Sequence, residues 1–233
     1  MQERQAGELT IFLHIPKTAG TSLRDTFQHV YPAERCLFIY AYEFGRDAGR
    51  LAALRQEAQG ADVLFGHLSY GLHQLLDLPA RYATVVREPV ARVVSYFRHQ
   101  ARQEDGEYHQ RIAAGMTLLD LLRSGECHEV NNHMTRILCG EEILGPLFHR
   151  APLVRALRNL ETDFLAVGVT ERMADSVALI SQRLAWAAQP PVPWLNVDPQ
   201  PGSLLVDQET LEEILRANAL DIELYERVVA DFV

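Results

Sequence analysis

Short apolar runs that end in polar turns recur along the chain, and most of them are followed by a segment with helical periodicity. Such runs are typical of strands that are buried on both faces of a sheet. They predict strands near Leu9–His14, Leu37–Tyr40, Val63–Phe65, Tyr82–Val86 and Leu165–Val169.

The segments between these runs favour helices. The predicted helices lie near Ser22–Val30, Gly45–Gln59, Pro89–Arg102, Ser176–Ala187, Glu209–Asn218 and Asp221–Phe232. Short helices and loops are expected from Gln103 to Asn159, a break at the prolines of 190–193, and a loop over Asn196–Ser203. Strands that alternate with helices imply a parallel sheet covered on both faces. The pattern therefore predicts a P-loop-like three-layer α/β/α fold, and the 233 residues suffice for one domain over 1–233.

The turn after the first strand carries the residues of an anion-binding loop. It reads His14-Ile15-Pro16-Lys17-Thr18-Ala19-Gly20-Thr21-Ser22 and leads into a helix. This arrangement points backbone N–H groups at an anion, while the lysine adds charge and the hydroxyls add donors. The loop differs from the standard P-loop, G-x-x-x-x-G-K-[ST], because Lys17 precedes Gly20. The alternative is an ordinary turn with a helix N-cap at Thr21 or Ser22.

A second polar turn follows the fourth strand in the segment VVREPVARVVSY. Arg87 stands at the strand end and Ser95 lies two turns into the helix, so a guanidinium fork and a hydroxyl could share one phosphate. The alternative is that Arg87 pairs with Glu88 or another carboxylate and that Ser95 is incidental. Ligands of parallel sheets bind beyond the carboxyl ends of strands. Lys17, His67 and Arg87 are expected to converge because each follows a strand end.

Together these segments resemble the nucleotide-binding signatures of sulfotransferases that use 3′-phosphoadenosine 5′-phosphosulfate (PAPS). The residue sequences of both segments are similar to those of the branch that includes heparan sulfate 2-O-sulfotransferase and small bacterial relatives. The first segment resembles the 5′-phosphosulfate loop and the second the 3′-phosphate site. Three later segments extend the resemblance: Gly66-His67, residues 131–140 with the pattern Asn-x-x-Thr-Arg-x-Leu-x-Gly, and the turn at 167–172.

The resemblance implies in-line transfer of a sulfuryl group from the co-substrate PAPS to an acceptor hydroxyl, with no metal required. Positioning and charge stabilisation dominate such chemistry. In this reading Lys17 stabilises the leaving phosphate, while Arg87 and Ser95 select PAPS over ATP. Thr135 and Arg136 are candidates for contact with the acceptor or nucleotide, an intraprotein ion pair being the alternative for Arg136. The implied nucleotide-binding set is Pro16, Lys17, Thr18, Ala19, Gly20, Thr21, Ser22, Arg87 and Ser95.

His67 is the predicted catalytic base, because an uncharged imidazole suits proton abstraction near neutral pH and because His67 matches the Gly-His element. The alternative is a structural histidine bound to a nearby carbonyl. The heparan sulfate enzyme has a second histidine two residues earlier, where this chain has Phe65. His14 could lie near the site or face the core, and His73 is a weaker alternative base.

The net charge of the chain limits the classes of partner that are expected. A net charge of −9 argues against a general nucleic-acid binder and makes a highly sulfated polyanion a less natural acceptor unless basic residues cluster. A solvated helix face is the alternative for most members of such a cluster. The candidates are Arg98, His99, Arg102, His133, Arg136, His149 and Arg150.

Cysteine usage and hydropathy bear on the compartment. Cys36, Cys127 and Cys139 are odd in number and lack zinc-site spacing, so reduced thiols of a cytoplasmic protein are expected, with Cys36 in a buried strand. No apolar run has the length of a membrane span, and the polar N-terminus lacks a signal-peptide core.

The acceptor is the least determined part of this interpretation. Segments 103–129 and 190–203, with Tyr108, His109 and Trp194, are expected to shape its pocket. Family analogy alone favours a carbohydrate or another hydroxyl-bearing metabolite.

Two other function classes compete with a sulfotransferase. A P-loop-type nucleotide or small-molecule kinase is disfavoured because Lys17 lies in the wrong register and no clear magnesium-binding aspartate follows a strand. A catalytically silent nucleotide-binding protein is disfavoured by the complete set of Lys17, His67, Arg87 and Ser95.

Overall fold

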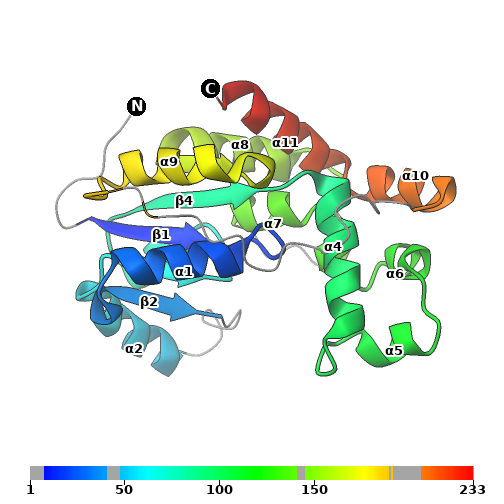
Figure 1. Ribbon diagram of the computed structural model, residues 1–233, viewed down its shortest axis with the longest axis horizontal. Helices are drawn as coiled ribbons and strands as arrows, with labels where there is room; N and C mark the ends of the chain where they lie inside the picture. The colour runs from blue at the N-terminus through cyan, green and yellow to red at the C-terminus, as the bar shows by residue number, and fades with distance from the viewer. Residues whose placement is uncertain (1–7, 41–47, 141–144, 189, 191–205, 233) are drawn as a thin grey trace.

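The computed structural model describes residues 8–40, 48–140, 145–188, 190 and 206–232. A five-stranded sheet with the order β2-β3-β1-β4-β5 forms its centre, and every neighbouring pair of strands is parallel. All strand carboxyl ends therefore point to one edge of the sheet (Figure 1). The strands are β1 (Leu9–Leu13), β2 (Cys36–Ile39), β3 (Val63–Gly66), β4 (Ala80–Val86) and β5 (Phe164–Val169).

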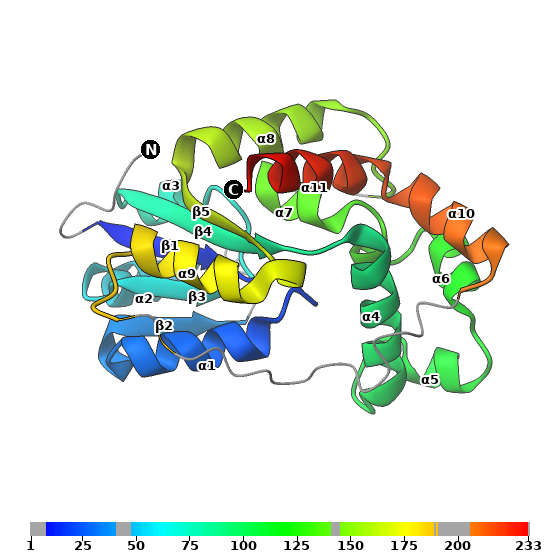
Figure 2. The same ribbon diagram turned by 45° about the horizontal axis from the view of Figure 1, so that its top comes forward.

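Helices cover both faces of this sheet (Figure 2). Side chains of a strand point alternately to its two faces. In β1, Phe12 packs with α1 (Gly20–Val30) and α9 (Met173–Arg183), whereas Ile11 and Leu13 pack into the opposite layer. This arrangement confirms the predicted three-layer α/β/α fold. The opposite layer contains α2 (Ala48–Gln59), α3 (Leu72–Leu76), α7 (His133–Cys139), α8 (Ala151–Asp163) and α11 (Ala219–Asp231).

A further group of helices stands beyond the carboxyl edge of the sheet (Figure 1). It has its own apolar cluster, to which Val93, Leu121 and Ile214 belong. The group places α4 opposite the strand ends. It consists of α4 (Pro89–Arg102), α5 (His109–Ala113), α6 (Leu118–Ser124), α10 (Gln208–Ala217) and the 3-10 turn η2 (His128–Val130). Two more 3-10 turns, η1 (Ala33–Arg35) and η3 (Thr170–Arg172), complete the element order.

Some differences from the sequence-based prediction lie at element ends. Helix α1 begins at Gly20, and its N-cap is Ala19 with φ of 62° and no side-chain cap. An N-cap at Thr21 or Ser22 is therefore wrong. Helix α9 covers Met173–Arg183 instead of starting at Ser176.

Two helices were not predicted. Helix α3 follows β3, and α8 occupies a region where only short helices and loops were expected. Helix α8 leads without a loop into β5, and it buries Leu153 and Ala156 against the sheet layer. Pro152 lies in its first turn, where the missing N–H leaves no helical hydrogen bond unmade.

Some expectations lie outside the described residues. They are the start of the helix predicted from Gly45, the prolines at 191–193, Trp194 and the loop over 196–203. None of the helices that the structure describes combines the length and apolarity needed to cross a bilayer. All three cysteines are buried free thiols, and Cys36 begins β2 as predicted.

Candidate active site

The loop between β1 and α1 has an unusual backbone. Lys17 and Ala19 adopt left-handed conformations with φ of 72° and 62°. Non-glycine residues rarely occupy this region, and such strain is found mostly where a site requires it. Successive N–H groups in a backbone that combines right-handed and left-handed conformations form the concave nests that bind anions. Within the loop, Thr18 Oγ1 donates to the Ile15 carbonyl at 2.8 Å, so its hydroxyl holds the loop itself.

Gly20, the first residue of α1, allows close approach of His14. A Cβ at position 20 would lie only 1.6 Å from His14 Nε2. A buried imidazole therefore packs directly under the start of the helix, and any larger residue at position 20 would displace it.

The two predicted phosphate-binding segments meet. Arg87 Nη1 donates to the Lys17 carbonyl at 2.9 Å, although the two residues are 70 positions apart. A second bond, from Thr84 Oγ1 to the Leu13 carbonyl at 2.7 Å, ties the ends of β4 and β1 together. The Glu88 carboxylate accepts from the amides of Val90 and Ala91 and so caps α4. Residues that follow two neighbouring strands thus lie at one place on the sheet edge.

Helix α4 carries a polar stripe toward this loop. Arg92, Ser95, His99 and Arg102 recur at spacings of three and four residues, which places them on one helix face. His99 and Arg102 both interact electrostatically with Lys17. Burial, followed by Arg102 and Arg87, lowers the Lys17 pKa to about 8. Part of the predicted basic cluster, His99 and Arg102, therefore lies beside Lys17.

His67 lies at the end of β3, where the local backbone fixes its position. Gly66 is required because a Cβ there would lie 1.5 Å from the Ile39 carbonyl oxygen, and the His67 amide donates to that same carbonyl at 3.1 Å. The side chain is half-buried, and burial lowers its pKa to about 4. The imidazole is therefore uncharged at neutral pH, as a base must be.

A second imidazole packs against His67. The ring centroids of His14 and His67 are 4.6 Å apart. His14 is buried, with 9% of its surface exposed. Burial, then His67 and Lys17, lowers the His14 pKa to about 3. His14 is thus both buried and beside the site. It comes from the end of β1, whereas position 65 holds a phenylalanine that stacks on Phe12.

The other predicted residues are placed differently. The His73 ring lies on α3 with Nδ1 2.7 Å from the Tyr82 hydroxyl. Thr135 is fully buried, and its amide donates to Asp221. Arg136 is buried and donates to the Asn131 side chain and to the Asn131 and Gly145 carbonyls. The Thr135 amide and the Arg136 guanidinium therefore donate to other groups of the protein.

Arg150, another of the basic candidates, and Tyr108, one of the predicted acceptor-pocket residues, are engaged elsewhere in the protein. Arg150 is exposed and pairs with Glu223 at 2.5 Å. Tyr108 is 4% exposed and belongs to the apolar cluster of the helical group. His109 begins α5, and Trp194 lies outside the described residues.

Sequence reasoning missed Glu129, an acidic residue in η2 that interacts electrostatically with Lys17. Nothing in its immediate sequence distinguishes it from the 31 acidic residues of the chain. The sequence did contain one signal that sets Lys17 apart: it is the only lysine of the chain, and all other basic residues of the Lys+Arg count are arginines.

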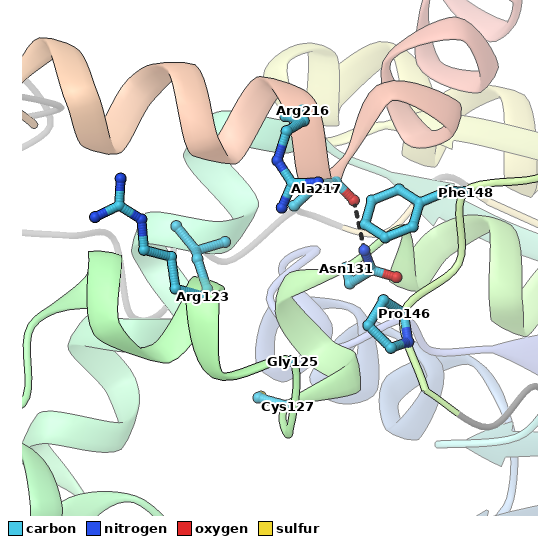
Figure 3. Close-up of a pocket in the computed structure, with 9 residues that line it drawn as sticks. Arg123, Gly125, Cys127, Asn131, Pro146, Phe148, Arg216 and Ala217 are labelled. Atoms are coloured by element: carbon cyan, nitrogen blue, oxygen red, sulfur yellow. Dashed lines mark hydrogen bonds between the residues drawn. The ribbon is translucent and has the colours of Figure 1, made fainter.

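A small pocket lies between α6, α10 and the residues Cys127, Asn131, Pro146 and Phe148 (Figure 3). It encloses about 100 Å³, and Asn131 Nδ2 bridges it by donating to the Ala217 carbonyl at 3.0 Å. Its two arginines, Arg123 and Arg216, pair with Glu209 and Glu213. The pocket therefore offers little unbalanced positive charge to an anion.

Two comparisons with known proteins give a match, one with a family model and one with a solved structure. A model of the sulfotransferase family matches residues 8–226. Among solved structures, mouse sulfotransferase SULT7A1 complexed with PAP is similar over 95% of this chain and 68% of the mouse chain, at 13% identity and a TM-score of 0.47. No curated protein matches the sequence.

The family match covers nearly all of the described residues, including both predicted phosphate-binding segments and His67. The chain therefore belongs to the sulfotransferase family, the enzymes that transfer a sulfuryl group from PAPS to an acceptor.

Proposed function

We propose that this enzyme transfers the sulfuryl group of PAPS to a hydroxyl of a small-molecule or carbohydrate acceptor, at the sheet edge where Lys17, His67 and Arg87 follow three strands. The observation that carries the proposal is the hydrogen bond from Arg87 to the Lys17 carbonyl. It joins a loop suited to a 5′-phosphosulfate to a guanidinium suited to a 3′-phosphate. A nucleotide with phosphate at both positions would engage both.

Each residue has a defined task in this proposal. The backbone amides of residues 18–22 bind the 5′-phosphate, and the Lys17 ammonium neutralises charge on the bridging oxygen as the S–O bond to phosphate breaks. Arg87 and Ser95 bind the 3′-phosphate. A guanidinium and a hydroxyl placed there favour PAPS over ATP.

His67 takes the proton of the acceptor hydroxyl as its oxygen attacks sulfur. The low pKa of the free enzyme makes the ring available but weakly basic. A bound phosphosulfate would raise that pKa, because a nearby negative charge favours the imidazolium form. Binding of the co-substrate therefore makes His67 a stronger base when it is needed.

Isothermal calorimetry with 3′-phosphoadenosine 5′-phosphate (PAP), AMP and ATP tests the proposal. We expect PAP to bind at least tenfold more tightly than AMP, since one charge-assisted phosphate contact is worth about 1.5–3 kcal/mol. Tighter binding of ATP with magnesium would instead support a kinase.

The acceptor requires a separate screen, with labelled PAPS over sugars, phenols, lipids and peptides. We expect label to appear on a hydroxyl-bearing acceptor and to be lost in Lys17→Ala. Tight PAP binding without transfer to any acceptor would favour the catalytically silent alternative.

A further inference from the structure

Three side-chain rings meet where β1, β2 and β3 end. His14 follows β1, Tyr40 follows β2 and His67 follows β3, and these strands are neighbours in the sheet. The ring centroids of His14 and His67 are 4.6 Å apart, and those of Tyr40 and His67 are 5.0 Å apart. The Tyr40 ring also meets the His14 ring edge-on, with 6.1 Å between centroids. The proposed base therefore packs directly against a second imidazole.

His14 is the buried member of this group. Its amide donates to the Gly66 carbonyl at 2.8 Å, which fixes its backbone beside the end of β3. Its ring lies under the start of α1, so close that a Cβ at Gly20 would lie 1.6 Å from Nε2. The Phe65 ring is 5.6 Å away, centroid to centroid. Packing on several sides therefore holds the His14 ring in place.

One polar atom of this buried ring is unused. His14 Nδ1 is shielded from solvent and has no hydrogen-bond partner among the residues that the structure describes. Burying a polar group without a partner destabilises the folded state. The nearby Phe12 and Phe65 are also fully buried, and their phenyl rings stack without leaving a polar atom unpaired. Packing alone therefore does not account for an imidazole at position 14.

The neighbouring imidazole supplies a reason. A histidine that acts as a base needs a lone pair on the nitrogen that takes the proton, so its other nitrogen carries a hydrogen. Where a base activates a hydroxyl, a third group commonly orients that base. Rings with centroids 4.6 Å apart can bring one nitrogen of each within hydrogen-bonding distance by a small rotation. His14 is thus placed to orient the His67 ring.

We propose that His14 is a positioning residue for His67: a nitrogen of its buried imidazole, and not only the bulk of the ring, orients the base toward the acceptor hydroxyl. The unpaired Nδ1 is then a loss of stability that is retained because turnover needs it. This inference deepens the proposed function and rests on it for the role of His67.

Two substitutions of nearly equal shape test the inference. His14→Asn keeps a polar atom close to the position of Nδ1, whereas His14→Leu places a methyl group there. Both remove the ring and should lose similar packing. We expect His14→Leu to melt at a higher temperature than His14→Asn and yet to transfer the sulfuryl group at least about tenfold more slowly, within the about 10²–10⁴-fold that a base contributes. PAP affinity should be the same in both variants.

Turnover is measured with labelled PAPS and the acceptor that the screen identifies, and PAP affinity by calorimetry. Thr10→Val is the matched control, because Thr10 lies in the same strand, is fully buried and also has an unpartnered polar atom, Oγ1. Removing that hydroxyl should raise the melting temperature and leave turnover unchanged. A comparable loss of turnover in Thr10→Val would show that the effect is not specific to His14, and would overturn the inference.

Equal turnover in His14→Asn and His14→Leu also overturns the inference. So does a loss of PAP affinity confined to His14→Leu, because His14 would then act on the nucleotide. If neither variant folds, His14→Gln and His14→Met repeat the comparison, since they too differ mainly in polarity. Transfer that is lost in Lys17→Ala but equal in both His14 variants refutes this inference alone. A wild-type enzyme that transfers label to no acceptor refutes the proposed function, and this inference with it.

Discussion

At the scale of single residues, the site depends on side chains whose ionisation is set by burial. Lys17 and His67 are both less basic than in water, mainly because burial disfavours their charged forms. For Lys17 this leaves an ammonium that is charged at neutral pH but loses its proton within a range that experiments can reach. Arginine would remain charged throughout.

The first prediction concerns Lys17 and pH. PAP affinity of the wild type should weaken as the pH rises through about 8, because the ammonium that attracts the phosphate is lost above its pKa. Lys17→Arg should remove this alkaline decline, whatever its effect on turnover. Calorimetry between about pH 6 and pH 10 measures both profiles. Parallel profiles for the two proteins would exclude Lys17 as the titrating group.

The second prediction concerns the base. His67→Ala should lower turnover by about 10²–10⁴-fold, the usual contribution of a general base, and leave PAP affinity almost intact. Single-turnover assays with the acceptor found by screening measure the rate, and calorimetry measures the affinity. His73→Ala is the control, because that ring is engaged by the Tyr82 hydroxyl. Full turnover in His67→Ala would refute the assignment.

At the scale of elements, strand ends and helix starts position these side chains. Gly20 gives His14 room beneath α1, and Gly66 lets the Ile39 carbonyl of β2 approach the end of β3. The N-cap at Glu88 starts α4 at the sheet edge, so that its polar stripe faces the loop. Backbone packing thus fixes residues that belong to three different strands.

The third prediction tests one of these contacts. Gly66→Ala should destabilise the protein by about 1–3 kcal/mol or more, because the new Cβ would overlap a backbone oxygen that cannot move away cheaply. Gly60→Ala is the control, since the nearest atom to its Cβ would be 3.7 Å away. Thermal unfolding should show a loss of about 2–4 °C per kcal/mol for Gly66→Ala. Equal melting temperatures would contradict the close approach.

At the scale of the whole molecule, the parallel sheet brings three strand ends to one edge, and the helical group built around α4 stands opposite. A ligand bound between them contacts both parts, so binding should stabilise the folded state as a whole. The bond from Arg87 to the loop joins the two proposed phosphate sites across this edge.

The fourth prediction follows from this arrangement. PAP at a hundredfold excess over its dissociation constant should stabilise the protein by about 2.7 kcal/mol, which corresponds to about 5–10 °C in melting temperature for a chain of this size. AMP at the same concentration should stabilise it less. Arg87→Ala should remove most of the difference between the two nucleotides. Equal shifts for PAP and AMP in the wild type would argue against a 3′-phosphate site.

Local sequence patterns were sufficient to predict the strands of the sheet. Each short apolar run became a strand within a few residues of its predicted ends, because a strand buried on both faces must be apolar along its length. The loop at Lys17 and the turn at Arg87 were recognisable because both follow such runs directly. Helix α8 was missed because its stability comes from packing of Leu153 and Ala156 into the core, which no local pattern reveals.

By itself, then, the sequence determined the strands, their alternation with helices and the residues placed at strand ends. These features depend on neighbours along the chain. Only the tertiary structure decided that His14 lies beside His67 and that Arg87 donates to the Lys17 carbonyl. These contacts join segments far apart in the chain, and their geometry depends on how whole elements pack.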